Sequence, residues 1–179
     1  MGCAFGDGGN KMTKRKYRWL LVLTSCLVGV VGCVAKEPDT VSLTGIVYNY
    51  SSETIAFVKV DGKDIARGLD ETPNGGVKGG SGMCCFELPV NAQVVDVEIT
   101  LWNKVKFRTP ASIEKWWPDL AHYGVVHILP GRKVVMQVTP SYPAPRKDLL
   151  ELRQQELGLE KKVLFRAWSS GPIERVDGK

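Results

Sequence analysis

The segment from Val94 to Trp102 alternates strictly between apolar and polar residues, and this pattern constrains the fold more than any other. Its apolar face consists of Val95, Val97, Ile99 and Leu101, and its other face of Asp96, Glu98, Thr100 and Trp102. A period of two residues is that of a β-strand with one buried face and one face in water. Because the buried face must pack against another layer, the chain requires a sheet with a core on one side.

Two turn sequences indicate how further strands pair. Thr54–Val60 is rich in β-forming residues and precedes Asp61–Gly62, a pair typical of the type I′ turn, in which both residues have positive φ. Val125–Leu129 and Lys133–Thr139 flank Pro130–Gly131, which favours a type II turn. We therefore predict a mostly β fold, either a small antiparallel sheet or a sandwich.

Three other segments complete the predicted domain. Leu43–Tyr50 is expected to form the first strand, because its apolar and aromatic side chains recur at every second position. Ala111–Trp117 is expected to form a short helical turn. Arg146–Leu157 has the mixture of leucine and charge typical of a short amphipathic C-terminal helix.

Arg67–Gly82 is rich in glycine and is predicted to be a loop that leads into a core strand. Its glycines resemble those of phosphate-binding loops, but the Gly-Lys-Ser/Thr ending of a P-loop is missing. Met83 stands where a nucleophile elbow needs its last glycine. We therefore expect no phosphate-binding or catalytic role for this loop.

The N-terminal part of the chain has the layout of a secretory signal. Basic residues between Lys14 and Arg18 precede an uncharged apolar stretch from Trp19 to Gly32. That stretch is shorter than the roughly 20 residues of a spanning helix. It ends in Val30-Val31-Gly32-Cys33, which resembles the lipobox of bacterial lipoproteins, with cleavage between Gly32 and Cys33 and acylation of Cys33.

Alternatives to this interpretation are an uncleaved anchor helix, cleavage without a lipid, or use of Cys26, which leaves a shorter apolar core. The predicted organisation is a leader over residues 1–32, with the signal at 12–32, and a lipidated tether over 33–42. A β-rich domain then spans 43–145, and a helix and tail span 146–179. Residue 34 is valine, and in similar lipoproteins it is aspartate that favours inner-membrane retention, so we expect an outer-membrane lipoprotein facing the periplasm.

The net charge of +5 does not indicate a nucleic-acid-binding protein. Five of the 24 basic residues but only one of the 19 acidic residues precede Cys33, which leaves 19 basic and 18 acidic residues after cleavage. A protein with nearly equal numbers of positive and negative side chains offers no net electrostatic attraction for DNA or RNA.

Cys84 and Cys85 would be the only cysteines besides Cys33 in the cleaved chain. Free cysteine is among the most buried residue types, so we favour two buried, inert thiols. The alternative is a pair of vicinal thiols that form a disulfide or react with a partner, which an oxidising periplasm favours.

The sequence contains no recognisable catalytic set. Its two histidines, His122 and His127, lack cysteine or carboxylate neighbours at metal-ligand spacing, and His127 is interpreted as a strand histidine with satisfied hydrogen bonds rather than a base. We therefore expect no enzyme activity, metal or cofactor. Trp102, Trp116 and Trp117 are candidates for contacting a protein partner, although at least one of these rings is expected to pack in the core.

Several of these features together resemble the bacterial lipoproteins of the domain-of-unknown-function 3304 family. They are the lipobox cysteine, Tyr48-Asn49-Tyr50 at the end of the first strand, the glycine-rich loop that runs into Cys84-Cys85, and Val126–Gly131. The resemblance covers residues 43–145, and the glycine-rich loop with the cysteine pair is its most specific part.

The genes of this family often lie beside type VI secretion genes, especially those for lipase effectors. The resemblance therefore implies an immunity protein that is tethered to the bilayer through Cys33 and that binds and neutralises an incoming phospholipase. The competing hypothesis is a structural or accessory envelope lipoprotein of a secretion system.

Overall fold

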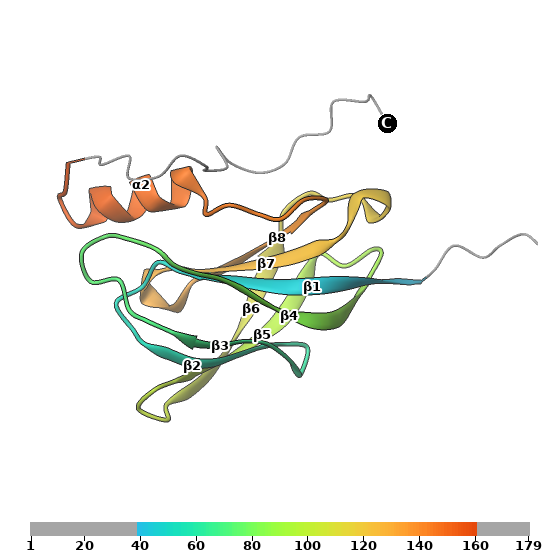
Figure 1. The fold of residues 1–179 in the computed structure, drawn as a ribbon, viewed down its shortest axis with the longest axis horizontal. Helices are drawn as coiled ribbons and strands as arrows, with labels where there is room; N and C mark the ends of the chain where they lie inside the picture. The colour runs from blue at the N-terminus through green and yellow to red at the C-terminus, as the bar shows by residue number, and fades with distance from the viewer. Residues whose placement is uncertain (1–38, 161–179) are drawn as a thin grey trace, which may run out of the picture. The chain divides into compact units, whose positions relative to one another are not determined.

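The alternating segments assemble into one sheet of eight strands in the computed structural model, which describes residues 39–160 (Figure 1). The strands are β1 (Thr40–Asn49), β2 (Ile55–Val60), β3 (Lys63–Leu69), β4 (Lys78–Pro89), β5 (Val94–Leu101), β6 (Lys106–Ile113), β7 (Tyr123–Ile128) and β8 (Val134–Thr139). One helix, α2 (Lys147–Glu156), follows them. The predicted fold class, mostly β and mostly antiparallel with a short C-terminal helix, is confirmed.

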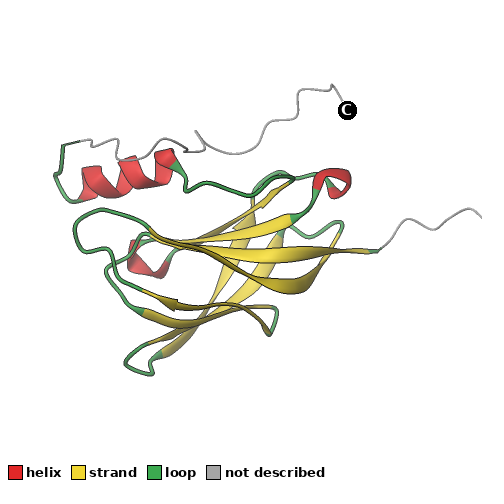
Figure 2. Cartoon of the chain, in the orientation of Figure 1, coloured by secondary structure: helices red, strands yellow, loops and turns green. Residues whose placement is uncertain are grey.

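The order of the strands in the sheet is β3-β2-β5-β6-β8-β7-β1-β4. Five of the seven neighbouring pairs are antiparallel, whereas β1–β7 and β6–β8 are parallel. The two edge strands, β3 and β4, contact each other, so the sheet is nearly closed into a barrel. Figure 2 shows the strands wrapping around a common interior, with loops gathered at the two ends.

The interior of the barrel is filled by the inward-facing side chains of the strands. The predicted alternation of β5 is confirmed, since Val95, Val97, Ile99 and Leu101 are buried there. Leu43 and Val47 of β1 and Val126 and Ile128 of β7 join the same cluster, together with Phe86, Leu88 and Met136. This cluster removes one face of every strand from water.

A second cluster lies outside the barrel, beneath α2. Ile46, Tyr48 and Tyr50 lie on the outer face of the sheet with Val125, and Leu149 and Leu150 of α2 cover them. Figure 1 shows α2 lying over β7 and β1. Both faces of β1 are therefore buried, and α2 forms part of the same folded unit as the sheet.

The turns confirm the positive φ values that the sequence indicated. Asp61 and Gly62 have φ of 46° and 83°, as a type I′ turn requires, and Gly131 has φ of 67°. Arg132 also has a positive φ of 61°, which the sequence did not indicate.

The prediction of a loop over Arg67–Gly82 is wrong at both ends. β3 continues to Leu69, and β4 already begins at Lys78, so only residues 70–77 connect the two strands. The glycines allow β4 to lie close to β1. A Cβ atom at Gly79 would lie 2.0 Å from the carbonyl oxygen of Val47, and a Cβ atom at Gly82 would lie 2.5 Å from the side chain of Ile46. The glycine-rich composition therefore permits a strand pairing and is not the mark of a flexible loop.

Two further boundaries differ from the prediction. Ala111–Ile113 belong to β6, where Ala111 pairs with Val95, and the helical turn begins only at Pro118. The strand was missed because the period of two is weak in Lys106–Ile113, which contains a proline and basic residues. β1 also starts at Thr40, inside the segment predicted as a tether. The predicted leader and Cys33 lie outside the described residues.

Candidate functional site

The loops at one end of the barrel are joined to each other by hydrogen bonds. β1 enters the barrel at Thr40 and spans about 30 Å, at roughly 3.3 Å per residue, before it ends at Asn49. We call the end at Asn49 the distal pole; it comprises residues 50–54, 70–77, 102–105 and 129–133. In Figure 1, β1 enters from the right and the β5–β6 turn lies at the lower left. The distal pole therefore lies opposite the point where the N-terminal segment enters.

Asn49 holds these loops together and is fully buried. Its amide group donates hydrogen bonds of 2.9 Å to the carbonyl oxygens of Glu53 and Asp70. Its side-chain oxygen accepts from the backbone N–H and the hydroxyl of Ser51, at 2.9 and 2.7 Å. Thr72 binds the Ser51 carbonyl through both its N–H and its hydroxyl. One amide side chain therefore joins the β1–β2 connection to the β3–β4 connection.

The distal pole exposes large apolar side chains. Trp102 is 72% exposed and Val105 is 42% exposed, both in the turn between β5 and β6. The backbone N–H of Trp102 donates to the carbonyl of Thr54 at 3.0 Å, which fixes this turn to the β1–β2 connection. Phe57, which is 41% exposed, lies on β2 beside Thr100 and carries the guanidinium of Arg67 over its ring. An exposed tryptophan on a rigid turn is typical of contact surfaces for proteins.

The structure does not bring the three candidate tryptophans together. Trp116 and Trp117 follow β6 at the end of the barrel opposite Trp102. Trp116 packs against the core and donates from its indole nitrogen to the carbonyl of Ala92 at 3.1 Å. Trp117 is half-buried, with the ammonium of Lys115 5.3 Å from its ring centre. Of these three tryptophans, only Trp102 exposes most of its side chain.

The expectation that Cys84 and Cys85 are buried thiols is wrong. Both residues are exposed, and their sulfur atoms are bonded to each other, as in the alternative that the sequence left open. The pair lies in edge strand β4 at a bulge, because Leu43 faces Phe86 and Gly45 faces Met83, which leaves two cysteines opposite Thr44. The side chains of Phe86 and Leu88 point into the barrel. Because the bulge adds one residue to β4, the side chains of both cysteines remain on the outer side of the strand.

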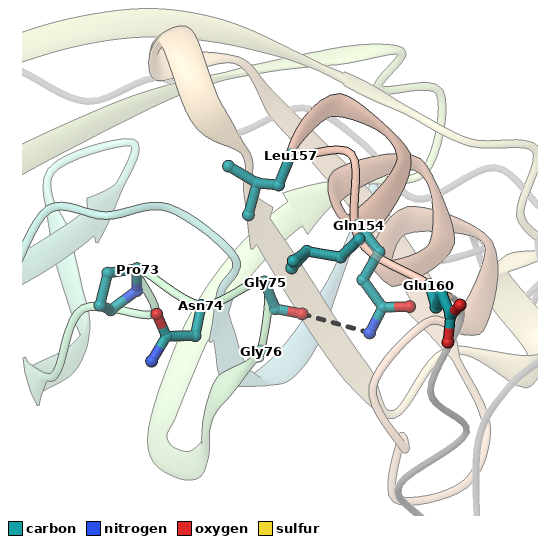
Figure 3. Close-up of a pocket in the computed structure, with 8 residues that line it drawn as sticks. Pro73, Asn74, Gly75, Gly76, Gln154, Leu157 and Glu160 are labelled. Atoms are coloured by element: carbon teal, nitrogen blue, oxygen red, sulfur yellow. Dashed lines mark hydrogen bonds between the residues drawn. The ribbon is translucent and has the colours of Figure 1, made fainter.

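Two cavities open at the distal pole beside the end of α2. The larger, about 550 Å³, lies between residues 73–76 and the C-terminal end of α2 (Figure 3). Gln154 bridges its two walls by donating to the carbonyl of Gly75 at 3.4 Å. Gly75 has a φ of 71°, and a Cβ there would lie 3.0 Å from Leu159. The smaller cavity, about 390 Å³, lies between the β1–β2 and β7–β8 connections and Arg153.

A buried polar network connects the sheet to the segment that leads into α2. Tyr50 accepts a 2.8 Å hydrogen bond from the backbone N–H of Arg146, and its hydroxyl lies 3.3 Å from Nδ1 of His127. The other ring nitrogen of His127 lies 3.4 Å from the side-chain oxygen of Gln137. Burial lowers the pKa of His127 to about 3, and the nearby charge of Arg146 adds to this.

His127 is therefore a neutral, buried strand histidine, as the sequence indicated. Its ring is stacked on Tyr48 and has no exposed surface from which a substrate proton could be taken. Burial likewise raises the pKa of Tyr48 to about 12. Within residues 39–160, no three His, Cys, Asp or Glu side chains are placed to hold a metal ion.

Sequence reasoning missed the residues that organise this site. Asn49 gave a weak signal as an amide at the end of an otherwise apolar strand. Arg132, Arg146 and Arg153 gave none, because single arginines in turns and on amphipathic helices usually lie in water.

No family model, no curated protein and no solved structure matches this chain. In the part of the chain that the structure describes, no helix is long and apolar enough to cross a membrane.

The burial of His127 predicts how stability depends on pH. The unfolded chain protonates this histidine below its ordinary pKa of 6.5, whereas the folded protein does so only near pH 3. Stability is therefore fully present above pH 6.5 and falls as the pH is lowered toward 3, by about 2 kcal/mol between pH 7 and pH 5. Urea unfolding at both pH values should show this loss in the native protein and in His122→Gln, whose ring is exposed, but not in His127→Gln. An unchanged pH dependence in His127→Gln would assign the effect to other groups.

Proposed function

We propose that this protein is a binding protein that docks a protein partner on its distal pole. The observation that carries the proposal is the 72% exposure of Trp102 in a turn that the backbone fixes to the β1–β2 connection. Val105 in the same turn and Phe57 on β2 are also exposed. Tryptophan is the residue type that most often supplies binding energy at protein interfaces, and a preorganised turn lowers the entropic cost of docking.

The proposed setting is the bacterial envelope, where a lipid on Cys33 anchors the protein. The leader and lipobox of the sequence support this setting. Six residues separate Cys33 from Thr40, where β1 begins. In this setting the domain would meet a partner that arrives in the periplasm.

The proposed partner is a type VI secretion phospholipase, which makes the protein an immunity protein. This assignment rests on the resemblance to the domain-of-unknown-function 3304 lipoproteins, and the exposed side chain of Trp102 supports it. The alternative is an accessory or structural lipoprotein of the secretion system, which would use the same surface for a component of the apparatus.

Trp102→Ala should weaken the complex with a lipase-type effector encoded beside this gene. We expect a native dissociation constant in the nanomolar range and a loss of at least about 30-fold in the variant, which corresponds to about 2 kcal/mol. The matched control is Val94→Ala, since Val94 is exposed at the opposite end of the same strand. Calorimetry measures both. If no complex forms and the effector lyses cells equally with and without this protein, the immunity function is wrong and the accessory function replaces it.

Cys33→Ser should abolish acylation. We expect the variant to take up no radiolabelled fatty acid and to remain in the supernatant when membranes are pelleted, because one lipid chain or none holds a protein only weakly. Cys26→Ser is the control and should be labelled normally. A labelled Cys33→Ser protein would exclude Cys33 as the acylated residue.

A further inference from the structure

The smaller cavity of the distal pole has the composition of an anion site. It measures about 390 Å³ and is lined by Arg132 and Arg153, by Ser51 and Ser52, and by a single carboxylate, Glu53. The two arginines come from the β7–β8 turn and from α2, and the other residues come from the β1–β2 connection. Three segments far apart in sequence therefore place two guanidinium groups at one cavity.

Arg153 is the most unusual member of this group. Its side chain is only 11% exposed, although arginine is rarely buried without a paired charge. One terminal nitrogen lies 3.6 Å from Glu156, and the buried Nε–H has no hydrogen-bond partner. Because its contact with Glu156 is long and involves one terminal nitrogen, this guanidinium group retains donors for an acceptor in the cavity.

Arg132 is held in place from the opposite side of the cavity. Its guanidinium lies over the ring of Phe107, 4.7 Å from the ring centre, and the positive φ of its backbone orients the side chain. Its contact with Glu53 is long, at 3.5 Å, and involves one oxygen. An arginine fork prefers two short, parallel hydrogen bonds to a carboxylate, so Glu53 leaves most of this capacity unused.

We propose that this cavity binds a carboxylate of an acidic side chain on the protein partner. The inference rests on the proposed function and extends it by naming what the partner must present next to Trp102. The cavity and Trp102 flank the same short segment, because Glu53 lines the cavity and the adjacent Thr54 accepts the hydrogen bond from Trp102. A partner with an acidic side chain beside an apolar patch would fill both positions. Glu53 acts as a weak internal competitor that the incoming carboxylate replaces at Arg132.

The test uses the full-length protein and a blocked hexaglutamate peptide at low ionic strength, with a blocked hexaglutamine peptide as the uncharged match. The Nε–H signal of Arg153 in an NMR titration reports on a guanidinium group that lines the cavity. We expect hexaglutamate to shift this signal and hexaglutamine to leave it unchanged. Arg132→Gln and Arg153→Gln should each weaken hexaglutamate binding at least 10-fold, whereas Arg108→Gln, a change of an exposed arginine on β6 outside the cavity, should not.

Glu53→Gln gives the sharpest outcome, because it should strengthen binding of hexaglutamate several-fold. Within residues 39–160, the hydrogen bond and ion pair of the Glu53 side chain are with Arg132, and the backbone contacts of Glu53 with Asn49 and Ser51 are retained in the variant. Unchanged or weaker binding in Glu53→Gln would overturn the proposal, as would binding of inorganic phosphate without binding of hexaglutamate. If hexaglutamate does not bind as expected but Trp102→Ala still weakens the complex with the effector, the proposed function is supported and the carboxylate site is wrong.

Discussion

The structure depends on the contacts of Arg146, where the polypeptide leaves the sheet and begins α2. Its side chain is only 3% exposed, and it binds both carboxylate oxygens of Glu114 at 2.7 Å as well as Asp148. Burial opposes its charge, but hydrogen bonds to Asp148 and Glu114 raise the pKa of Arg146 above its ordinary value. Its backbone N–H also binds Tyr50. Removing one partner of such a buried pair typically costs about 3–5 kcal/mol, so this arginine fixes α2 to the sheet.

The position of α2 in turn determines the shape of the two cavities at the distal pole. Arg153 and Gln154 lie on the last turns of this helix, and they line the two cavities opposite the loops that Asn49 joins. The surface is therefore assembled from the end of β1, from three other connections of the sheet and from the helix. Its polar groups hold backbone segments in fixed positions, and the buried histidine is neutral.

The sequence predicted those parts of the fold that local patterns determine. The alternation of β5 and the Asp61–Gly62 turn were identified because period and turn chemistry act over a few residues. β6 was missed because proline and basic residues weaken its period. The start of β4 was missed because its glycines, which serve contacts with β1, were interpreted as a loop. The burial of Cys84 and Cys85 was predicted wrongly, since a bulge depends on the register with another strand. The contacts of Asn49 with Asp70 and of Arg146 with Glu114 join residues distant in sequence, so local patterns do not predict them.

Hydrogen exchange of the α2 amides in Arg146→Gln tests the central claim, that Arg146 fixes α2 and thereby the distal pole. The account predicts much faster exchange for the amides of Leu150 to Leu157 in the variant, with unchanged exchange in β5, because the barrel core does not involve Arg146. Exchange in α2 equal to that of the native protein would contradict the claim. An equal increase in β5 would also contradict it, since Arg146 would then support the barrel as a whole and not the helix.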